Sequence, residues 1–339
     1  MLKVRISNTY PEWPLLRQTP GAKGVWGDCR FLINDEVEEC DYWVVHEGLL
    51  RTERTLCPPE NTILITGEPP SVRTYDEEFL KQFATVIACD RNIPHPNVIF
   101  SQQSLPWHVG RLVRGNETLG FSKDYDELSA MSSFEKDKLI SVISSDKSST
   151  PGHALRLEFT RKLAERLGSR IDVFGRGIRD IDDKWDAVSR YKYHVVLENN
   201  SYPDYWTEKL SDAYLGGAHP FYYGCPNLAD YFSPAAFTKI DINDLEAAVN
   251  VIEASLAGNR YEASLSEIHK ARNLVLNTYN LFPMIWNHIS SRQQGAKRSI
   301  TLQPEAAFSE PDDSRRIKLG RRFKSLFTFG SWQGNDRPV

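Results

Sequence analysis

Residues 193–209 have the sequence Tyr-His-Val-Val-Leu-Glu-Asn-Asn-Ser-Tyr-Pro-Asp-Tyr-Trp-Thr-Glu-Lys, an apolar run followed by a polar connection. The run at 193–197 is short and contains adjacent valines, which is typical of a buried strand of a mostly parallel sheet. A helical segment at 207–215 follows and ends at Gly216-Gly217. The stretch therefore predicts a strand, a polar turn and a helix, the unit from which α/β domains are built.

The surrounding segments repeat this unit. Short apolar runs at 139–143, 171–174 and 218–223 predict further strands. Between the first two runs, Thr150-Pro151 predicts the start of a helix and Gly168 its end. The apolar stripe of that helix recurs every four residues, at Leu155, Phe159, Leu163 and Leu167. This alternation predicts a doubly wound α/β domain over residues 138–290.

The first part of the chain carries a similar series of short apolar runs. They lie at 4–6, 42–45, 62–65, 86–88 and 97–100, and an irregular linking stretch at 101–135 follows them. Because 339 residues are enough for two domains, we expect a second Rossmann-like domain over residues 1–137. From about residue 291 the pattern decays into Gln, Ser, Pro and charge, so we expect residues 291–339 to be a linker and a tail.

The composition excludes several classes of protein. Apolar residues make up 40% and charged residues 25%, which is ordinary globular usage and excludes collagen-like and disordered chains. No run approaches the roughly 18 apolar residues of a transmembrane helix, and the first seven residues lack the apolar block of a signal peptide. The five cysteines include no C-x-x-C pair, so we expect reduced, buried thiols in a cytoplasmic protein.

Positive charge is concentrated near the carboxyl terminus. The six bases of residues 314–332 are Arg315, Arg316, Lys318, Arg321, Arg322 and Lys324. Without them the chain has 35 bases against 45 acids, a poor balance for a nucleic-acid-binding protein. Leu319, Phe323 and Leu326 share one side, which predicts a basic amphipathic helix on an anionic membrane surface. Docking of this helix on the acidic body is the alternative.

Polar side chains gather where the predicted strands end. Open α/β sheets bind ligands beyond the carboxyl ends of their strands, and a cation beside a helix amino terminus suits phosphate. Arg156 lies in the first turns of its helix, and residues 198–209 combine carboxylates, amides, rings and an ammonium group. This predicts a pocket for an anionic, ring-bearing ligand such as a nucleotide. A capping turn with solvated charges fits the spacing equally well.

Several blocks of sequence carry a resemblance. In the second half they are Arg156-x-x-Phe159, Asp172-Val173-Phe174-Gly175, Tyr191-Lys192-Tyr193, Glu198-Asn199, Tyr205-x-Thr207-Glu208-Lys209 and Gly217-Ala218-His219-Pro220. These blocks resemble the donor-binding signature of glycosyltransferase family 10, the α-1,3/4-fucosyltransferases. Thr66-Gly67-Glu68 is similar to the acidic turn of the bacterial members. Trp206 stands where the family usually has Val or Ile, and His219 replaces an aliphatic residue, which leaves the sugar and the acceptor open.

The resemblance implies a GT-B fold, in which two Rossmann-like domains face each other across a cleft and the second holds GDP-fucose. It implies inverting transfer of fucose to a hydroxyl of an N-acetylglucosamine-containing or lipid-linked glycan, with an α-1,3 linkage. Glu68 would be the general base. The implied donor-binding residues are Arg156 and Lys209 for the diphosphate, Glu208 for the ribose, and Asn199 and Tyr205 for the diphosphate and fucose. No metal ion or other cofactor is expected to be essential.

Other interpretations stay open from the sequence. The fold could use another nucleotide sugar, or bind a glycan or nucleotide without catalysis. Asp180, Asp182 and Asp183 are similar to the metal-binding string of other transferases, but we interpret them as a solvated loop. We expect His219 to be a hydrogen-bonded core residue, while His95 and His108 could line the acceptor side. Core packing is also the default for four tryptophans that could stack on acceptor sugars: Trp13, Trp26, Trp43 and Trp107.

Overall fold

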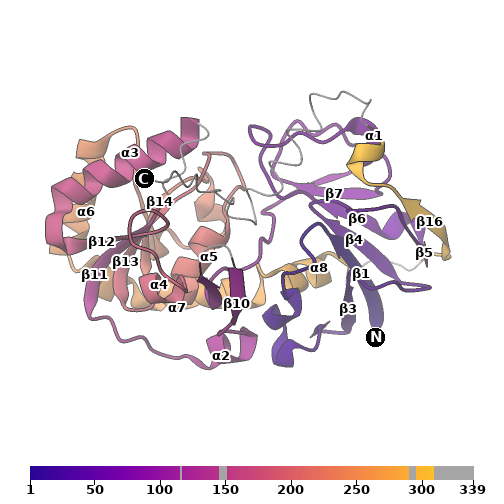
Figure 1. The fold of residues 1–339 in the computed structure, drawn as a ribbon, viewed down its shortest axis with the longest axis horizontal. Helices are drawn as coiled ribbons and strands as arrows, with labels where there is room; N and C mark the ends of the chain where they lie inside the picture. Colours follow the sequence, from indigo (N-terminus) through magenta and orange to yellow (C-terminus); the bar gives the residue numbers. More distant parts are fainter. Residues whose placement is uncertain (115–116, 145–150, 290–294, 309–339) are drawn as a thin grey trace, which may run out of the picture.

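The chain folds into two α/β halves that lie side by side, as the computed structural model shows (Figure 1). The structure describes residues 1–114, 117–144, 151–289 and 295–308. Each half is built on its own largely parallel sheet with helices packed on it, so the predicted pair of α/β domains is confirmed. Thr150, predicted to start a helix, and the basic tail at 314–332 lie outside the described residues.

The amino-terminal half contains a seven-stranded sheet in the order β2-β3-β1-β4-β6-β7-β8. Its strands are β1 (Leu2–Asn8), β2 (Val25–Trp26), β3 (Cys29–Ile33), β4 (Tyr42–His46), β6 (Thr62–Ile65), β7 (Thr85–Ala88) and β8 (Val98–Phe100). All neighbours pair in parallel except β2 and β3. Each apolar run predicted in this half therefore overlaps a strand.

The carboxyl-terminal half contains a five-stranded parallel sheet in the order β12-β11-β13-β14-β15. Its strands are β11 (Lys138–Ile143), β12 (Ile171–Phe174), β13 (Tyr191–Leu197), β14 (His219–Tyr223) and β15 (Thr238–Lys239). Its helices are α3 (Pro151–Leu167), α4 (Trp185–Val188), α5 (Glu208–Leu215), α6 (Leu245–Ala257) and α7 (Arg260–Asn277).

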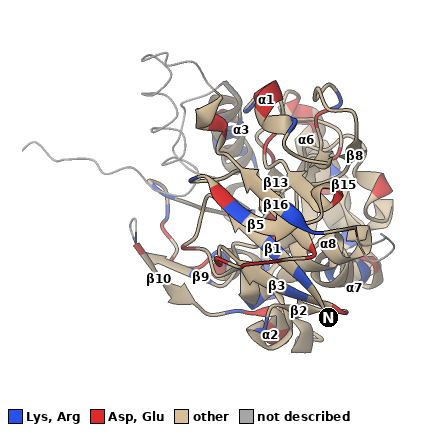
Figure 2. Cartoon of the chain, turned by 90° about the vertical axis from the view of Figure 1, so that its right-hand side faces the viewer, with Lys and Arg blue, Asp and Glu red and all other residues tan. Residues whose placement is uncertain are grey.

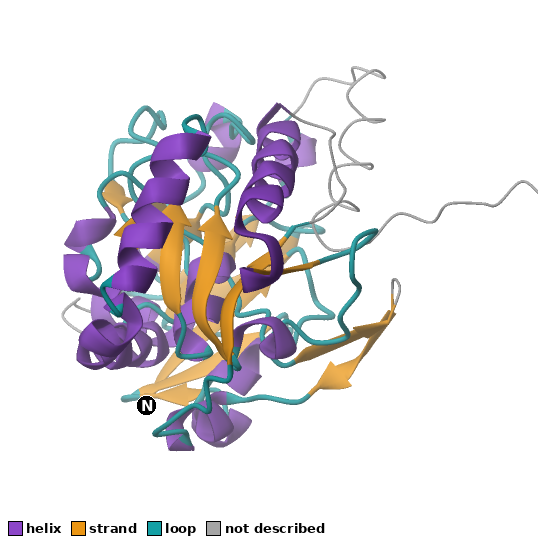
Figure 3. Ribbon diagram, turned by 90° about the vertical axis from the view of Figure 1, so that its left-hand side faces the viewer, coloured by secondary structure: helices purple, strands orange, loops and turns teal. Residues whose placement is uncertain are grey.

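Both faces of this second sheet are covered by helices (Figure 3). Val195 of β13 packs in the apolar cluster that includes residues of α3 and α6. Its neighbour Val196 points to the opposite face and packs in the cluster that includes residues of α5 and α7. A strand buried on both sides needs apolar residues at successive positions, which is why the run at 193–197 predicted it.

Two small antiparallel pairs complete the description. β9 (Arg111–Arg114) and β10 (Glu117–Phe121) form a hairpin, and α2 (Tyr125–Ala130) follows it. The stretch at 101–135 was expected to be irregular. It is only partly so, because residues 111–114 pair with residues 117–121 as strands. β5 (Glu53–Cys57) pairs with β16 (Arg298–Leu302), beside the first sheet (Figure 2), and α1 (Glu77–Leu80) packs on the same half.

The expected boundary at residue 290 is wrong for two segments. α8 (Leu281–Ile289), expected in the second domain, packs its apolar side chains on β1, β4 and β6 of the first sheet. β16, expected in a linker, is a strand of the first half, where Leu302 is buried. The physical reason is that residues 1–137 form only short helices, so one face of the first sheet needs a cover from elsewhere in the chain.

Two further expectations concern the state of the cysteines and the presence of a transmembrane helix. All five cysteines are buried and free, as predicted from their spacing. None of the helices in the described part of the chain is long and apolar enough to cross a membrane.

Candidate active site between the two sheets

Two predicted site residues from different halves of the chain are in direct contact. Glu68 lies in the turn after β6, and Tyr205 lies in the connection between β13 and α5. The hydroxyl of Tyr205 donates a hydrogen bond to Oε2 of Glu68 at 3.0 Å, although 137 positions separate them. Both residues follow the carboxyl ends of parallel strands, the edge at which α/β sheets bind ligands.

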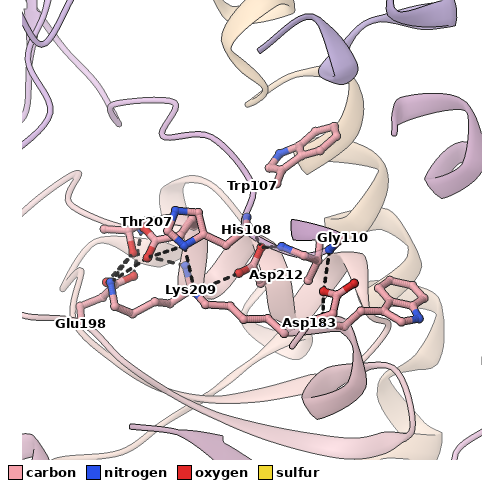
Figure 4. Close-up of polar contacts among 12 residues, drawn as sticks. Trp107, His108, Gly110, Asp183, Glu198, Thr207, Lys209 and Asp212 are labelled. Carbon is pink, nitrogen blue, oxygen red and sulfur yellow. Dashed lines mark hydrogen bonds and ion pairs between the residues drawn. The ribbon is translucent and has the colours of Figure 1, made fainter. Parts of the chain in front are cut away.

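Glu198 fixes the start of α5 (Figure 4). This buried carboxylate directly follows β13 and accepts hydrogen bonds from the backbone N–H of Thr207 at 2.9 Å and from its hydroxyl at 2.7 Å. Thr207 is the N-cap residue of α5, and its hydroxyl accepts the N–H of Lys209. The spacing of Glu198 and Thr207 therefore positions Glu208 and Lys209 in the first turn of the helix.

Glu208 and Lys209 form a charged pair beside that carboxylate. The ammonium group of Lys209 lies 3.2 Å from Oε1 of Glu208 and 3.4 Å from Oε2 of Glu198. Burial alone would raise the pKa of Glu208, but the positive charge of Lys209 and the nearby His108 and Lys184 outweigh it, so this pKa is well below its usual range. Glu208 is therefore a carboxylate that accepts hydrogen bonds.

The pKa of Glu68, unlike that of Glu208, is raised above its usual range. Burial raises its pKa to about 7, while the hydrogen bond from Tyr205 and the charge of Lys209 oppose that rise. A carboxyl group with a pKa near neutral pH is suited to taking and releasing a proton.

Arg156 reaches the same cluster from α3. One of its terminal nitrogens donates to the carbonyl oxygen of Leu197 at 3.1 Å. Its Nε is buried without a hydrogen-bond partner in the described part of the chain. Burial lowers the pKa of Arg156, and the negative charges of Glu198 and Glu208 oppose this effect. The buried Nε is a free donor close to acidic groups.

Asn199 lies at the start of the connection between β13 and α5, next to α3. Its carbonyl oxygen is next to Gly152, where a Cβ atom would come within 2.8 Å. Gly152 therefore lets the helix amino terminus approach the end of β13 closely. The structure thus brings together five of the six predicted site residues, Glu68, Arg156, Tyr205, Glu208 and Lys209, and it places the backbone of Asn199 beside α3.

A second group of polar residues includes Asp212 and Lys184, which were not predicted. Asp212 accepts the backbone N–H groups of His108 and Val109 at 2.9 and 3.0 Å, which attaches the interdomain connection to α5 (Figure 4). The ammonium group of Lys184 lies 3.1 Å from Nδ1 of His108 and 3.4 Å from Asp212. His108, expected on the acceptor side, therefore lies beside the donor signature, 4.0 Å from Glu208. The helical spacing of Glu208 and Asp212 was the available signal.

Asp204 links the connection between β13 and α5 to residues of both halves. One carboxylate oxygen accepts from Asn227 at 2.8 Å and from the Tyr231 hydroxyl at 2.9 Å. The other pairs with Arg91 of the amino-terminal half. The connection is therefore held from both halves of the protein, an arrangement that the sequence did not predict.

The acidic string at 180–183 is not uniformly solvated. Asp183 is 6% exposed and accepts hydrogen bonds from the N–H of Gly110 at 2.8 Å and from the hydroxyl of Ser122 at 2.9 Å. Our solvated-loop interpretation is wrong for Asp183, because these buried donors need an acceptor. In the described ranges, no group of three or more His, Cys, Asp or Glu residues could hold a metal ion.

Four of the six remaining candidate residues lie in the core. His219 is buried between the hydroxyls of Ser264 and Thr238, each 2.9 Å away, as expected for a core histidine. His95 instead contacts the carbonyl oxygens of Phe83 and Asn97. Trp13, Trp43 and Trp107 are at most 3% exposed, so they pack the interior, whereas Trp26 is half-buried.

Comparison with known proteins locates a family match in the second half of the chain. Residues 133–257 match the model of the glycosyltransferase family 10 (fucosyltransferase) C-terminal domain. The α-(1,3)-fucosyltransferase FucT of Helicobacter pylori is 29% identical over 140 residues, which cover 39% of this chain and 28% of the relative. The α-(1,3)-fucosyltransferase 4 of Bos taurus is 37% identical over 95 residues, which cover 25% and 23%. The chain thus spans less than a third of the length of these relatives.

Solved structures are similar over more of the chain but at low identity. An α1,3-fucosyltransferase with GDP-fucose has a TM-score of 0.45 and 16% identity, over 83% of this chain and 92% of the other. A glycosyltransferase from Rickettsia africae has a TM-score of 0.47 and 10% identity, over 85% and 97%. Five of the six predicted site residues lie inside the matched range 133–257, and Glu68 lies outside it.

Proposed function

We propose that this chain, whose residues 133–257 match the model of the glycosyltransferase family 10 domain, is an inverting fucosyltransferase that uses GDP-fucose. The acceptor is a hydroxyl of an N-acetylglucosamine-containing glycan, joined through an α-1,3 linkage. The observation that carries the proposal is the contact between Tyr205 of the matched domain and Glu68 of the other half. It puts a carboxyl group with a near-neutral pKa directly beside the family signature.

The donor lies against α3 and the start of α5. The diphosphate takes the free Nε of Arg156 and the ammonium group of Lys209, since a charge-assisted hydrogen bond is stronger than a neutral one. Glu208, which stays ionised, accepts hydrogen bonds from the ribose hydroxyls. Asn199 and Tyr205 position the diphosphate and the fucose. The two cations also offset the charge that develops on departing GDP.

Transfer is a single displacement at the anomeric carbon. The acceptor oxygen attacks as the bond between that carbon and the GDP oxygen breaks, so GDP leaves with the bonding electrons. Glu68 takes the proton of the acceptor hydroxyl, because an alcohol is a poor nucleophile while it keeps that proton. With a pKa of about 7, Glu68 is a stronger base than an exposed glutamate and is still ionised at slightly alkaline pH.

A thermal-shift panel of nucleotides and a transfer assay test this function. GDP should stabilise the protein more than UDP, CMP or dTDP, because binding to the native state alone raises its stability. Transfer from GDP-fucose to β-galactosyl-N-acetylglucosamine acceptors should then yield product. A response to another nucleotide would point to a different donor sugar, and the absence of any response would refute both enzymatic interpretations.

The basic tail adds a second, independent element to the proposal. We propose that residues 314–332 contact an anionic membrane surface peripherally, because a segment with six bases and no acid is attracted to negatively charged lipid. A lipid-linked glycan at that surface would then be a natural acceptor. The truncation described in the Discussion tests this contact.

A further inference from the structure

A second glutamate lies next to the proposed base, outside every motif. Glu47 follows β4, and its backbone N–H donates to the carbonyl oxygen of Ile65 at the end of the neighbouring parallel strand β6. That hydrogen bond extends the pairing of the two strands by one step. Glu47 and the turn Gly67-Glu68 therefore leave the sheet at the same edge.

The side chain of Glu47 packs directly on that turn. A Cβ atom at Gly67 would come within 2.6 Å of Cδ of Glu47 and 2.7 Å of its Oε1. Position 67 is therefore a glycine because the Glu47 carboxyl group occupies the space of a side chain. A change at either residue would displace the turn that carries Glu68.

Glu47 is a largely buried residue. The residue is 6% exposed, and its carboxylate makes no hydrogen bond or ion pair with any residue that the structure describes. Arg73, the nearby cation, lies instead 2.6 Å from Glu305 and over the ring of Tyr75.

The charge of Glu68 acts on the carboxyl group of Glu47. The pKa of Glu47 is raised to about 7, mainly by burial and then by the charge of Glu68, while Arg73 opposes the rise. The charged and titratable groups around the pair come from several elements, namely Tyr10, Arg73, Tyr75, Glu198, Tyr205, Glu208, Lys209 and Glu305. Neighbouring His46 stays neutral, since burial lowers its pKa to about 4.

We propose that Glu47 is a positioning residue that acts on transfer through Glu68, as a second carboxyl group packed against the turn that carries the base. This role rests on the proposed function. Two neighbouring carboxyl groups resist being charged at the same time, so the pair keeps its last proton to a higher pH than a lone glutamate does. A base with a higher proton affinity takes the acceptor proton more effectively, as long as it is ionised. The packing of Glu47 on Gly67 holds that base in place.

The pH dependence of transfer tests the role with Glu47→Gln, which keeps the packing on Gly67 and removes the charge. Loss of the neighbouring charge should lower the pKa of Glu68, so the acidic limb of the pH–rate profile should move to lower pH by about one unit. The plateau rate should fall several-fold, since the base is weaker. Glu36→Gln, which alters a glutamate 82% exposed in its side chain, is the matched control and should leave the profile unchanged. An unmoved acidic limb in Glu47→Gln would refute the proposal.

Carboxyl resonances give a second readout that needs no turnover. In full-length protein with carboxyl-labelled glutamate, the Glu68 resonance, assigned by its loss in Glu68→Gln, should titrate at lower pH in Glu47→Gln. If the wild-type protein transfers no fucose, the proposed function fails, and the resonance still decides whether the two groups are coupled. Identical titration of Glu68 in both proteins would overturn the coupling.

Discussion

The carboxylate of Glu198 accepts both polar hydrogens of Thr207, the backbone N–H at 2.9 Å and the hydroxyl at 2.7 Å. The same carboxylate is the buried partner of Lys209. One side chain at the end of β13 thus caps α5 and orients the proposed phosphate-binding cation. The fixed spacing of Glu198, Thr207 and Lys209 follows from this geometry.

Replacement of Glu198 by Ala should therefore lower the stability of the protein. Thr207 would lose the acceptor of its buried N–H, and we expect the free energy of unfolding to fall by about 1.5–3 kcal/mol. Urea denaturation measures this change. Glu246→Ala, which removes a surface partner of Arg166, is the control and should cost far less. Equal losses in the two variants would show that Glu198 does not hold the helix.

The two cations of the site should each matter for the nucleotide. Lys209→Ala and Arg156→Ala should each weaken GDP binding by about 1.5–3 kcal/mol, because the diphosphate loses a charge-assisted partner. Calorimetry with GDP measures the affinity. Lys270→Ala, at an exposed lysine paired with Glu267, should bind GDP like the wild type. Wild-type affinity in both site variants would remove the phosphate assignment.

Sequence patterns were sufficient for the sheets but not for every element that covers them. The run at 193–197 predicts β13 because strands buried on both faces need consecutive apolar residues. An apolar helix pattern at 281–289, in contrast, does not say which sheet it covers, and α8 returns to the first half. Assignment of such a helix depends on which sheet face lacks a cover, a property of the whole fold.

In the candidate site, too, some residues could be predicted from the sequence and others could not. Arg156, Glu208 and Lys209 belong to contiguous blocks with fixed spacing, so a motif located them. Glu47 and Lys184 have no such block, and they reach the site only because β4 lies beside β6 and the start of α4 lies beside α5. Contacts of that kind arise from tertiary structure and leave no local pattern.

Transfer should not require a divalent metal ion. Arg156 and Lys209 supply positive charge beside the diphosphate. In many phosphate sites Mg²⁺ supplies this charge instead. Turnover with GDP-fucose should therefore be the same with and without EDTA. Loss of activity in EDTA that Mg²⁺ or Mn²⁺ restores would show that the metal-free mechanism is wrong.

Removal of the basic tail should separate membrane contact from nucleotide binding. A chain ending after residue 310 should keep its GDP affinity and no longer sediment with anionic vesicles. The reason is that each base near a charged surface contributes about 1 kcal/mol before screening. Vesicles of neutral lipid are the control for non-specific adsorption. Full-length protein that ignores anionic vesicles, or a truncated chain that fails to fold, would mean that the tail packs on the body.

Glu68→Gln should remove the base and leave the site otherwise intact. The amide keeps the size of the side chain and its contact with Tyr205, but it cannot take the proton of an acceptor hydroxyl. We therefore expect GDP affinity to stay unchanged while kcat falls by about 10²–10⁴-fold. Calorimetry with GDP and transfer from GDP-fucose to β-galactosyl-N-acetylglucosamine acceptors measure the two quantities.

The pH dependence of Glu68→Gln provides the decisive comparison. A base with a pKa of about 7 is ionised above that pH, so wild-type turnover should fall as the pH drops through neutrality. The variant lacks the titrating group, and its residual rate should show no acidic limb. If Glu68→Gln kept most of its turnover together with the wild-type limb, another group of the amino-terminal half would be the base. The Tyr205–Glu68 contact would then serve only to join the two halves.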